Sequence, residues 1–393
     1  MTLKNCDRTN LPSGANVAIA WCLATGSLIG CDGSSPSARI FVDTLPTGTI
    51  VVQNVGDGTW DDRPWTLEEV KRIGDPNTFY NIRAVAVDRN SDVYVADRSN
   101  TVRVFDNTGA LLRTIGQQGS GPGEFAWIVG MAIDPHQSLW VVDYRNARFS
   151  IFDASGQLRR EVRRDRSMFY VPWPGRIDSS GIVHDFTRLP DVAWSSYAPV
   201  RLNASGDIEA VAALPVYQER HVPFAPRLLW TLAPSGDVWF GISDSYRLYK
   251  ITFDGDTVVM TERDVLPAKI SRSERRAAFE GWQARVGTIR AAAGTSGGQV
   301  VRQSEIPDTK PIFRALWVDS AGHLWVVLAE TGGNMVDKFD IFDPAGRYLG
   351  RVESPELLDA TVVPAFQGDQ MYAVTRDDDD VPYVVQYAIN YGR

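Results

Sequence analysis

Residues 93–116 read VYVADRSNTVRVFDNTGALLRTIG, and residues 139–162 repeat nearly the same pattern as LWVVDYRNARFSIFDASGQLRREV. Each stretch holds three short apolar runs separated by turn-forming residues. The Asp-x-x-Gly in each marks a hairpin turn, because Asp bonds to its own backbone and Gly accepts a positive φ. A unit of short strands that recurs at a fixed spacing predicts a repeat architecture.

An aromatic residue in the second run of each unit marks the repeat along the whole chain. Successive copies are 46, 44, 55, 86 and 47 residues apart. Four antiparallel strands in about 45 residues form one blade of a β-propeller. The six positions are Tyr94, Trp140, His184 (in the aromatic position), Trp239, Trp325 and Tyr372.

The two ends of the repeat array complement each other. The segment 67–74, LEEVKRIG, matches the fourth strand of a unit but has no first three strands before it, whereas the last copy lacks its fourth strand. We expect this N-terminal strand to complete the last blade, which leaves no open sheet edge at the seam. The sequence therefore predicts an all-β fold, a six-bladed propeller of four-stranded antiparallel blades over residues 47–393.

The stretch 85–125, VAVDRNSDVYVADRSNTVRVFDNTGALLRTIGQQGSGPGEF, resembles the NHL-type six-bladed propellers of bacterial envelope proteins. The resemblance extends over residues 67–393, and it is weaker in the third and fourth copies. It implies that ligands bind on the face where the loops from the fourth strand to the next blade gather with those from the second strand to the third. The fold alone implies no particular activity.

The N-terminus resembles a bacterial lipoprotein signal. Lys4 and Arg8 precede the apolar run 17–30, VAIAWCLATGSLIG, which ends directly before Cys31. The resemblance implies that residues 1–30 are a signal peptide, that Cys31 is lipidated, and that residues 31–46 are a flexible tether. The protein would then lie in the cell envelope, periplasmic or at the cell surface, and reach the membrane through its lipid only. A cytosolic protein with an apolar leader is the alternative.

Charge and cysteine content exclude some classes of function. The formal net charge of −8 argues against a nucleic-acid partner, because phosphate binding needs clustered cations. All three cysteines lie in the first 31 residues, so the propeller can form no disulfide and no cysteine-ligated metal site. The basic run 159–166, RREVRRDR, falls on an expected outer strand, where charged side chains prevent pairing with another sheet edge. A surface patch that binds an anionic partner is the alternative interpretation.

A helical insertion is expected at 264–310, between blades 4 and 5. Ser271 and Glu274 form a capping-box pattern that starts a helix. An apolar stripe at helical spacing follows, which predicts packing on the propeller, either as a clamp on the blade rim or as a lid over the channel mouth. The stripe comprises Phe279, Trp282, Val286 and Ile289.

Three arginines stand near the starts of innermost strands, where they could grip a carboxylate or a phosphate through the guanidinium fork. The alternative is that each pairs with a nearby acidic residue. Trp127 and Trp173 are expected as stacking walls, and His221 as a polar contact. The arginines are Arg83, Arg227 and Arg314.

The sequence supports a metal site less strongly than an anion-binding site. Residues 377–380 read DDDD and could hold calcium together with carbonyl oxygens, although a solvated acidic loop is the simpler interpretation. His136 and His323 fall in turns of the opposite face, and His184 fills the aromatic position, so a zinc site of several histidines is not expected. No motif of a catalytic nucleophile or metalloprotease occurs, and no catalytic residue or cofactor is predicted.

The sequence therefore favours a lipid-anchored, extracytoplasmic, monomeric module that binds a small anionic ligand or an envelope protein. The alternative is a metal-dependent hydrolase that resembles lactonases and esterases of the same fold. Asn81 is the only plausible metal ligand near the strand starts, which weakens that alternative. A sensory domain that reports a ligand to a membrane partner is a third hypothesis.

Overall fold

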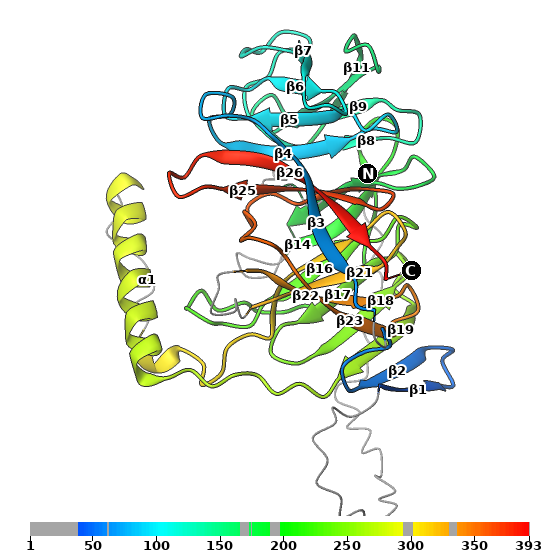
Figure 1. Ribbon diagram of the computed structural model, residues 1–393, viewed down its shortest axis with the longest axis vertical. Coiled ribbons are helices and arrows are strands. Elements are labelled where there is room, and N and C mark those ends of the chain that lie inside the picture. The colour runs from blue at the N-terminus through cyan, green and yellow to red at the C-terminus, as the bar shows by residue number, and fades with distance from the viewer. Residues whose placement is uncertain are drawn as a thin grey trace, which may run out of the picture. The chain divides into compact units, whose positions relative to one another are not determined.

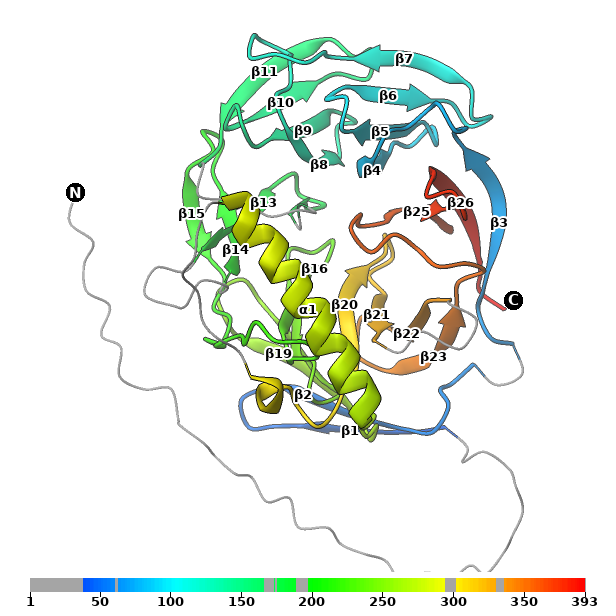
Figure 2. The same ribbon diagram turned by 90° about the vertical axis from the view of Figure 1, so that its left-hand side faces the viewer.

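The computed structural model describes residues 38–60, 63–165, 173, 175–188, 197–293, 302–329 and 336–392. Cys31 and the expected signal peptide lie outside them. The described strands form six sheets that are arranged as a ring, with one helix, α1, across one face (Figures 1 and 2). The predicted six-bladed propeller is confirmed.

Blades 1 to 3 follow one another in the chain, and each is a four-stranded antiparallel sheet with its first strand innermost. Blade 1 comprises β4 (Ile82–Val87), β5 (Val93–Asp97), β6 (Val102–Phe105) and β7 (Leu111–Ile115). Blade 2 comprises β8 (Ile128–Ile133), β9 (Leu139–Asp143), β10 (Arg148–Phe152) and β11 (Leu158–Arg163). Blade 3 comprises β12 (Arg176–Ile177), β13 (Val183–Arg188), β14 (Tyr197–Leu202) and β15 (Ile208–Val211).

Blades 4 to 6 complete the ring, and two of them take strands from the N-terminal part of the chain. Blade 4 comprises β16 (Leu228–Leu232), β17 (Val238–Ile242), β18 (Arg247–Ile251) and β19 (Thr257–Arg263), joined by β2 (Ile50–Val55) and β1 (Arg39–Thr44). Blade 5 comprises β20 (Phe313–Val318), β21 (Leu324–Leu328), β22 (Lys338–Phe342) and β23 (Tyr348–Glu353). Blade 6 comprises β24 (Ala365–Gln367), β25 (Gln370–Arg376), β26 (Pro382–Asn390) and β3 (Thr66–Ile73).

The ring closes as the sequence predicts. Strand β3 pairs antiparallel with β26, from Val384 opposite Ile73 to Asn390 opposite Thr66. Leu67 and Ile73 point into the core and are buried. A strand from the start of the propeller and a strand from its end therefore share one sheet, which ties the two ends of the array together by backbone hydrogen bonds.

The tether expected at 31–46 is wrong from Arg39 onward. Residues Arg39–Thr44 form β1, which pairs antiparallel with β2, and β2 runs parallel to β19 at the outer edge of blade 4. Val52 is buried against the blade, and the Asn54 Nδ2 donates to Thr261 Oγ1 at 2.8 Å. This burial holds the hairpin on the propeller, so blade 4 has six strands rather than four.

An Asp carboxylate recurs after the first strand in four of the six blades, and it is buried in three of them, as Asp88, Asp178 and Asp319. In blade 1 the Asp88 Oδ1 accepts the backbone N–H groups of Asn90 and Asp92 at 2.8 and 3.0 Å, while its Oδ2 accepts the Tyr94 hydroxyl at 3.2 Å. One side chain thus holds the turn between the first two strands and the aromatic residue of the second strand. The other three pairs are Asp134 with Trp140, Asp178 with His184, and Asp319 with Trp325.

His184 takes the aromatic position of blade 3, as expected. Its Nε2 lies 2.9 Å from the Asp178 carboxylate, and its ring packs against Phe253 of the next blade with centroids 5.3 Å apart. Burial lowers the pKa of His184 below its ordinary value, although Asp178 opposes this effect. His184 is therefore a packed core residue that replaces an aromatic ring.

We predict that Asp319→Ala destabilises the protein more than Asp343→Ala does in the same blade. Both carboxylates accept two backbone N–H groups of a turn, but only the buried Asp319 also accepts the indole N–H of Trp325. The expected losses are about 3 kcal/mol for Asp319→Ala and about 1 kcal/mol for Asp343→Ala. Urea unfolding followed by tryptophan fluorescence measures both, and equal losses would contradict the role assigned to Asp319.

Candidate functional site

The helix α1 (Arg272–Ala293) lies across the face where ligands are expected (Figure 2). It follows β19 and precedes β20, within the predicted insertion at 264–310. The predicted capping box is present: the Ser271 N–H donates to the Glu274 carboxylate at 2.9 Å, and the Glu274 N–H donates to Ser271 Oγ at 3.2 Å. The helix therefore begins where the sequence predicts.

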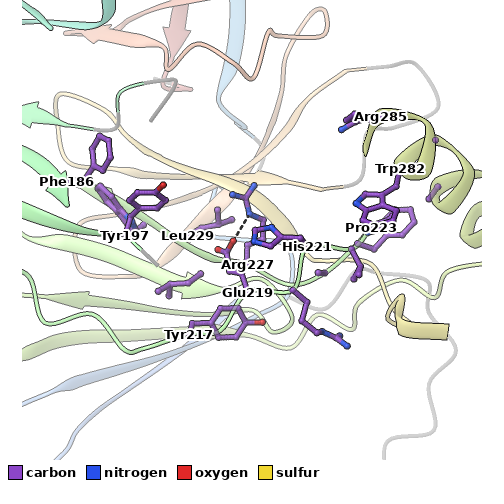
Figure 3. Close-up of a pocket in the computed structure, with 18 residues that line it drawn as sticks. Phe186, Tyr197, Tyr217, Glu219, His221, Pro223, Arg227, Leu229, Trp282 and Arg285 are labelled. Atoms are coloured by element: carbon purple, nitrogen blue, oxygen red, sulfur yellow. Dashed lines mark ion pairs between the residues drawn. The ribbon is translucent and has the colours of Figure 1, made fainter. Parts of the chain in front are cut away.

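A pocket of about 820 Å³ opens between α1 and blades 3 and 4 (Figure 3). One wall comes from the end of β13 and the start of β14, the floor from the segment 217–230, and the roof from α1. Aromatic side chains surround most of it. They are Phe186, Tyr197, Tyr217, Phe224, Trp230 and Trp282.

The helix serves both as a clamp and as a roof. Near its N-terminus, the Arg275 guanidinium donates to the Pro307 carbonyl at 2.9 Å and to Asp308 at 2.8 Å, which ties the helix to the segment that leads into blade 5. One turn further, Phe279 stacks on Trp282 with centroids 6.2 Å apart, and Trp282 lines the pocket. Of the predicted apolar stripe, the side chain of Ile289 lies outside the described part of the chain.

The polar groups of the pocket come mainly from the loop between blades 3 and 4. The Glu219 carboxylate lies 3.6 Å from Arg227 Nε, and His221 lines the same cavity (Figure 3). Burial raises the pKa of Glu219, while Arg227 and His221 lower it. Burial likewise raises the pKa of Tyr217. The pocket thus combines an apolar lining with Arg227, a half-exposed cation whose carboxylate partner, Glu219, is nearly covered.

His221 and Arg227 are the two predicted ligand residues that the structure brings together. Arg83 and Trp127 form a second pair elsewhere on the same face, where the guanidinium lies 5.3 Å from the indole centroid. Arg145 covers the same indole at 4.9 Å. Burial and the neighbouring cations Arg98 and Arg145 lower the pKa of Arg83. Four of the six predicted residues therefore form two separate pairs.

Arg314 and Trp173 occupy positions that differ from the prediction. Arg314 forms an ion pair with Asp337, whose side chain is fully buried. This arginine therefore follows the alternative interpretation, in which it pairs with an acidic residue of the protein itself. Trp173 is 5% exposed, and its Nε1 donates to the Asp185 carboxylate at 2.9 Å. Its indole packs against Phe149 within the core, because Asp185 in the middle of β13 holds it there. Neither residue lines the pocket.

Acidic side chains at the ends of second strands are engaged in backbone bonds on this face. Asp97 accepts the N–H of Tyr80, and Asp143 accepts the N–H groups of Ala126 and Trp127. These bonds hold the loops that enter blades 1 and 2. In the part of the chain that the structure describes, no three His, Cys, Asp or Glu side chains gather closely enough to hold a metal ion.

The acidic run 377–380 forms the turn between β25 and β26, as predicted. The Asp377 Oδ1 accepts the backbone N–H groups of Asp379 and Val381 at 3.0 and 2.9 Å, and the bond from Val381 lowers the pKa of Asp377. Asp380 pairs with Arg376 at 3.3 Å. Two of the four carboxylates thus have partners within the hairpin itself.

Sequence analysis missed Glu219, Tyr217 and Tyr197 as pocket residues. A signal was available for the first two, because the segment 212–227, AALPVYQERHVPFAPR, is long for a connection between blades and mixes aromatic with charged residues. Tyr197 carries no such signal, since it reads as an ordinary strand residue. Its place in the pocket follows from the packing of blade 3 beside blade 4.

Comparisons with known proteins agree with the fold. A family model described as a six-bladed beta-propeller, DUF5128, matches residues 75–177. A search of curated proteins finds no match. Among the described residues, no helix combines the length and the apolar character that a membrane-spanning segment needs.

Solved structures similar to the chain include a Bacteroides fragilis protein described as exported, with 13% identity, a TM-score of 0.52, and coverage of 86% of this chain and 99% of that one. A virginiamycin B lyase from Staphylococcus aureus has 13% identity, a TM-score of 0.43, and coverage of 83% and 100%. Regucalcin, a calcium-binding protein from Agrobacterium tumefaciens, has 14% identity, a TM-score of 0.43, and coverage of 84% and 96%. At 13% identity, the likeness to the Bacteroides fragilis protein shows the fold alone.

We predict that Arg314→Ala and Arg83→Ala have different effects on stability. Removal of Arg314 leaves the buried Asp337 carboxylate without its cation, which costs about 2 kcal/mol or more. The hydrogen bonds of Arg83 are long, 3.4 Å to Asn100 and 3.3 Å to the Ile128 carbonyl, so its removal should cost less than about 1 kcal/mol. Thermal unfolding measures both, and a neutral Arg314→Ala would show that the ion pair contributes nothing.

Proposed function

We propose that the protein is a binding module for a small ligand that has an apolar body and an anionic group, and that the pocket under α1 is its site. The observation that carries the proposal is the pocket of about 820 Å³ with its aromatic lining and a few convergent polar groups. Ligand sites of this size are commonly built in this way, mostly apolar with a small number of placed polar groups.

The distribution of charge supports an anionic ligand. Arg220, Arg227 and Arg285 line the pocket together with His221, whereas Glu219 is the one carboxylate among the described lining residues. A guanidinium binds carboxylates, sulfonates and phosphates through paired N–H donors. The aromatic rings supply apolar surface for the remainder of the ligand.

A metal-dependent hydrolase of lactonase or esterase type remains the alternative proposal. It requires a divalent cation, and tightly held calcium in the purified protein would favour it over a simple binding module. Lactones and esters would then be the first substrates to assay. A protein that binds anions through the pocket without retaining metal would favour the binding module.

We also propose that the protein is an NHL-type propeller exported to the cell envelope and anchored there by a lipid on Cys31. The run LIGC at residues 28–31 supports this proposal. Cys31→Ser should abolish incorporation of labelled fatty acid during growth, and the protein should leave the membrane fraction. Cys22→Ser, a change within the expected leader, is the matched control and should keep both label and fractionation. Labelling that persists in Cys31→Ser would contradict the anchor.

Binding in the pocket can be tested with two fluorescent probes of nearly equal shape. Anilinonaphthalene sulfonate is anionic, whereas N-phenylnaphthylamine is its neutral parent. We expect Trp282→Ala to weaken binding of both about tenfold, because it removes an aromatic wall that each probe contacts. Fluorescence titration measures the two dissociation constants.

Tyr80→Ala is the matched control, since Tyr80 is an exposed aromatic residue outside the pocket lining. Its substitution should leave both dissociation constants unchanged. If Trp282→Ala binds both probes as the natural protein does, the pocket is not their site and the proposal fails.

A further inference from the structure

We propose that the pocket selects ligands that carry a strongly acidic oxyanion, a sulfonate, sulfate or phosphate group, and that this group replaces Glu219 at Arg227 while Glu219 takes up one proton from solvent. The inference rests on the proposed function and adds to it the acidity of the ligand and the pH dependence of its binding.

The geometry of the pair supports an exchange. The Glu219 side chain is 12% exposed and the Arg227 side chain is 54% exposed, so an incoming ligand reaches the guanidinium before the carboxylate. Their contact, 3.6 Å between Nε and Oε2, is longer than the paired N–H···O contacts of a bidentate ion pair. Figure 3 shows this pair beside His221, with Trp282 and Arg285 of α1 to one side of it.

The groups around Glu219 decide where the proton goes. From its own loop it faces Arg227, His221, Arg220 and Tyr217, and Asp244 acts on Tyr217 from the β17–β18 turn. From α1 the charged lining group is Arg285, and from blade 3 the lining residues Phe186 and Tyr197 add no charge at neutral pH. Glu219 is the one carboxylate that lines the described pocket.

An anion at Arg227 changes the electrostatics of Glu219 in two ways. It shares the cation that stabilises the ionised carboxylate, and it adds a like charge next to a carboxylate that is nearly covered. Burial already raises the pKa of Glu219. Protonation removes the repulsion and turns Glu219 into a donor that can bond to the ligand. The balance is one proton gained by the carboxylate for each anion bound.

The acidity of the ligand follows from this exchange. A group that must stay ionised while a neighbouring carboxyl group becomes protonated needs a pKa well below that of Glu219. Sulfonates, sulfates and phosphates meet this requirement, whereas a carboxylic acid would compete for the same proton. By linkage, the affinity for such an anion rises as the pH falls, by up to about tenfold per pH unit for one proton.

The test measures binding of anilinonaphthalene sulfonate and N-phenylnaphthylamine between about pH 5 and pH 8. In the natural protein, affinity for the sulfonate should rise severalfold per pH unit as the pH falls, while affinity for the neutral probe stays constant. Circular dichroism at each pH verifies that the fold is retained.

Glu219→Gln is the decisive variant, because its amide keeps the shape but has no charge and takes up no proton. It should bind the sulfonate about tenfold more tightly at pH 8 and with no pH dependence. His221→Asn is the matched control and should retain the pH dependence. A pH dependence that persists in Glu219→Gln but disappears in His221→Asn would overturn the proposal and assign the proton to His221.

Failure of the proposed function is a separate outcome. If Trp282→Ala leaves binding of both probes unchanged, the pocket itself is not the site. If both probes depend on Trp282 but the sulfonate binds without any pH dependence, the pocket stands as the site and the exchange at Glu219 is wrong.

Discussion

A single Asp carboxylate in each of four blades joins the turn after the first strand to the aromatic side chain of the second strand. One oxygen of Asp88 accepts two backbone N–H groups, and the other accepts the Tyr94 hydroxyl. The carboxylate is buried, and so is most of the aromatic residue that it holds. Because a buried charge is tolerated only with several donors around it, the interaction fixes turn, strand and interblade packing at once.

The loops on the opposite face of the ring take no part in these bonds, so their sequences can vary without disturbing them. The turns held by these carboxylates join first and second strands, whereas the loops between blades lie on the face that carries α1. There the loop from β15 to β16 and the insertion that contains α1 enclose the pocket, while blades 1 and 2 present the Arg83 and Trp127 group. The scaffold thus sets the position of the site, and the loops determine its chemistry.

The candidate site was predictable only in part. Arg227, predicted near the start of an innermost strand, and His221, predicted as a polar contact, both line the pocket. Arg314 occupies an equivalent strand position, yet its charge is matched by the buried Asp337. Nothing in the sequence around Arg314 distinguishes the two cases, because Asp337 lies 23 residues further along the chain and reaches Arg314 only through strand pairing.

The sequence by itself determined the number of blades, the strand that closes the ring and the start of the insertion helix. These features depend on short patterns, an aromatic strand position and Asp-x-x-Gly turns that recur along the chain and a capping box at the helix start. Only the tertiary structure decided that β1 and β2 extend blade 4, that Trp173 belongs to the core, and that Glu219 and Arg227 lie together under Trp282. Those outcomes depend on contacts between segments distant in the chain, where burial and charge pairing outweigh local preference.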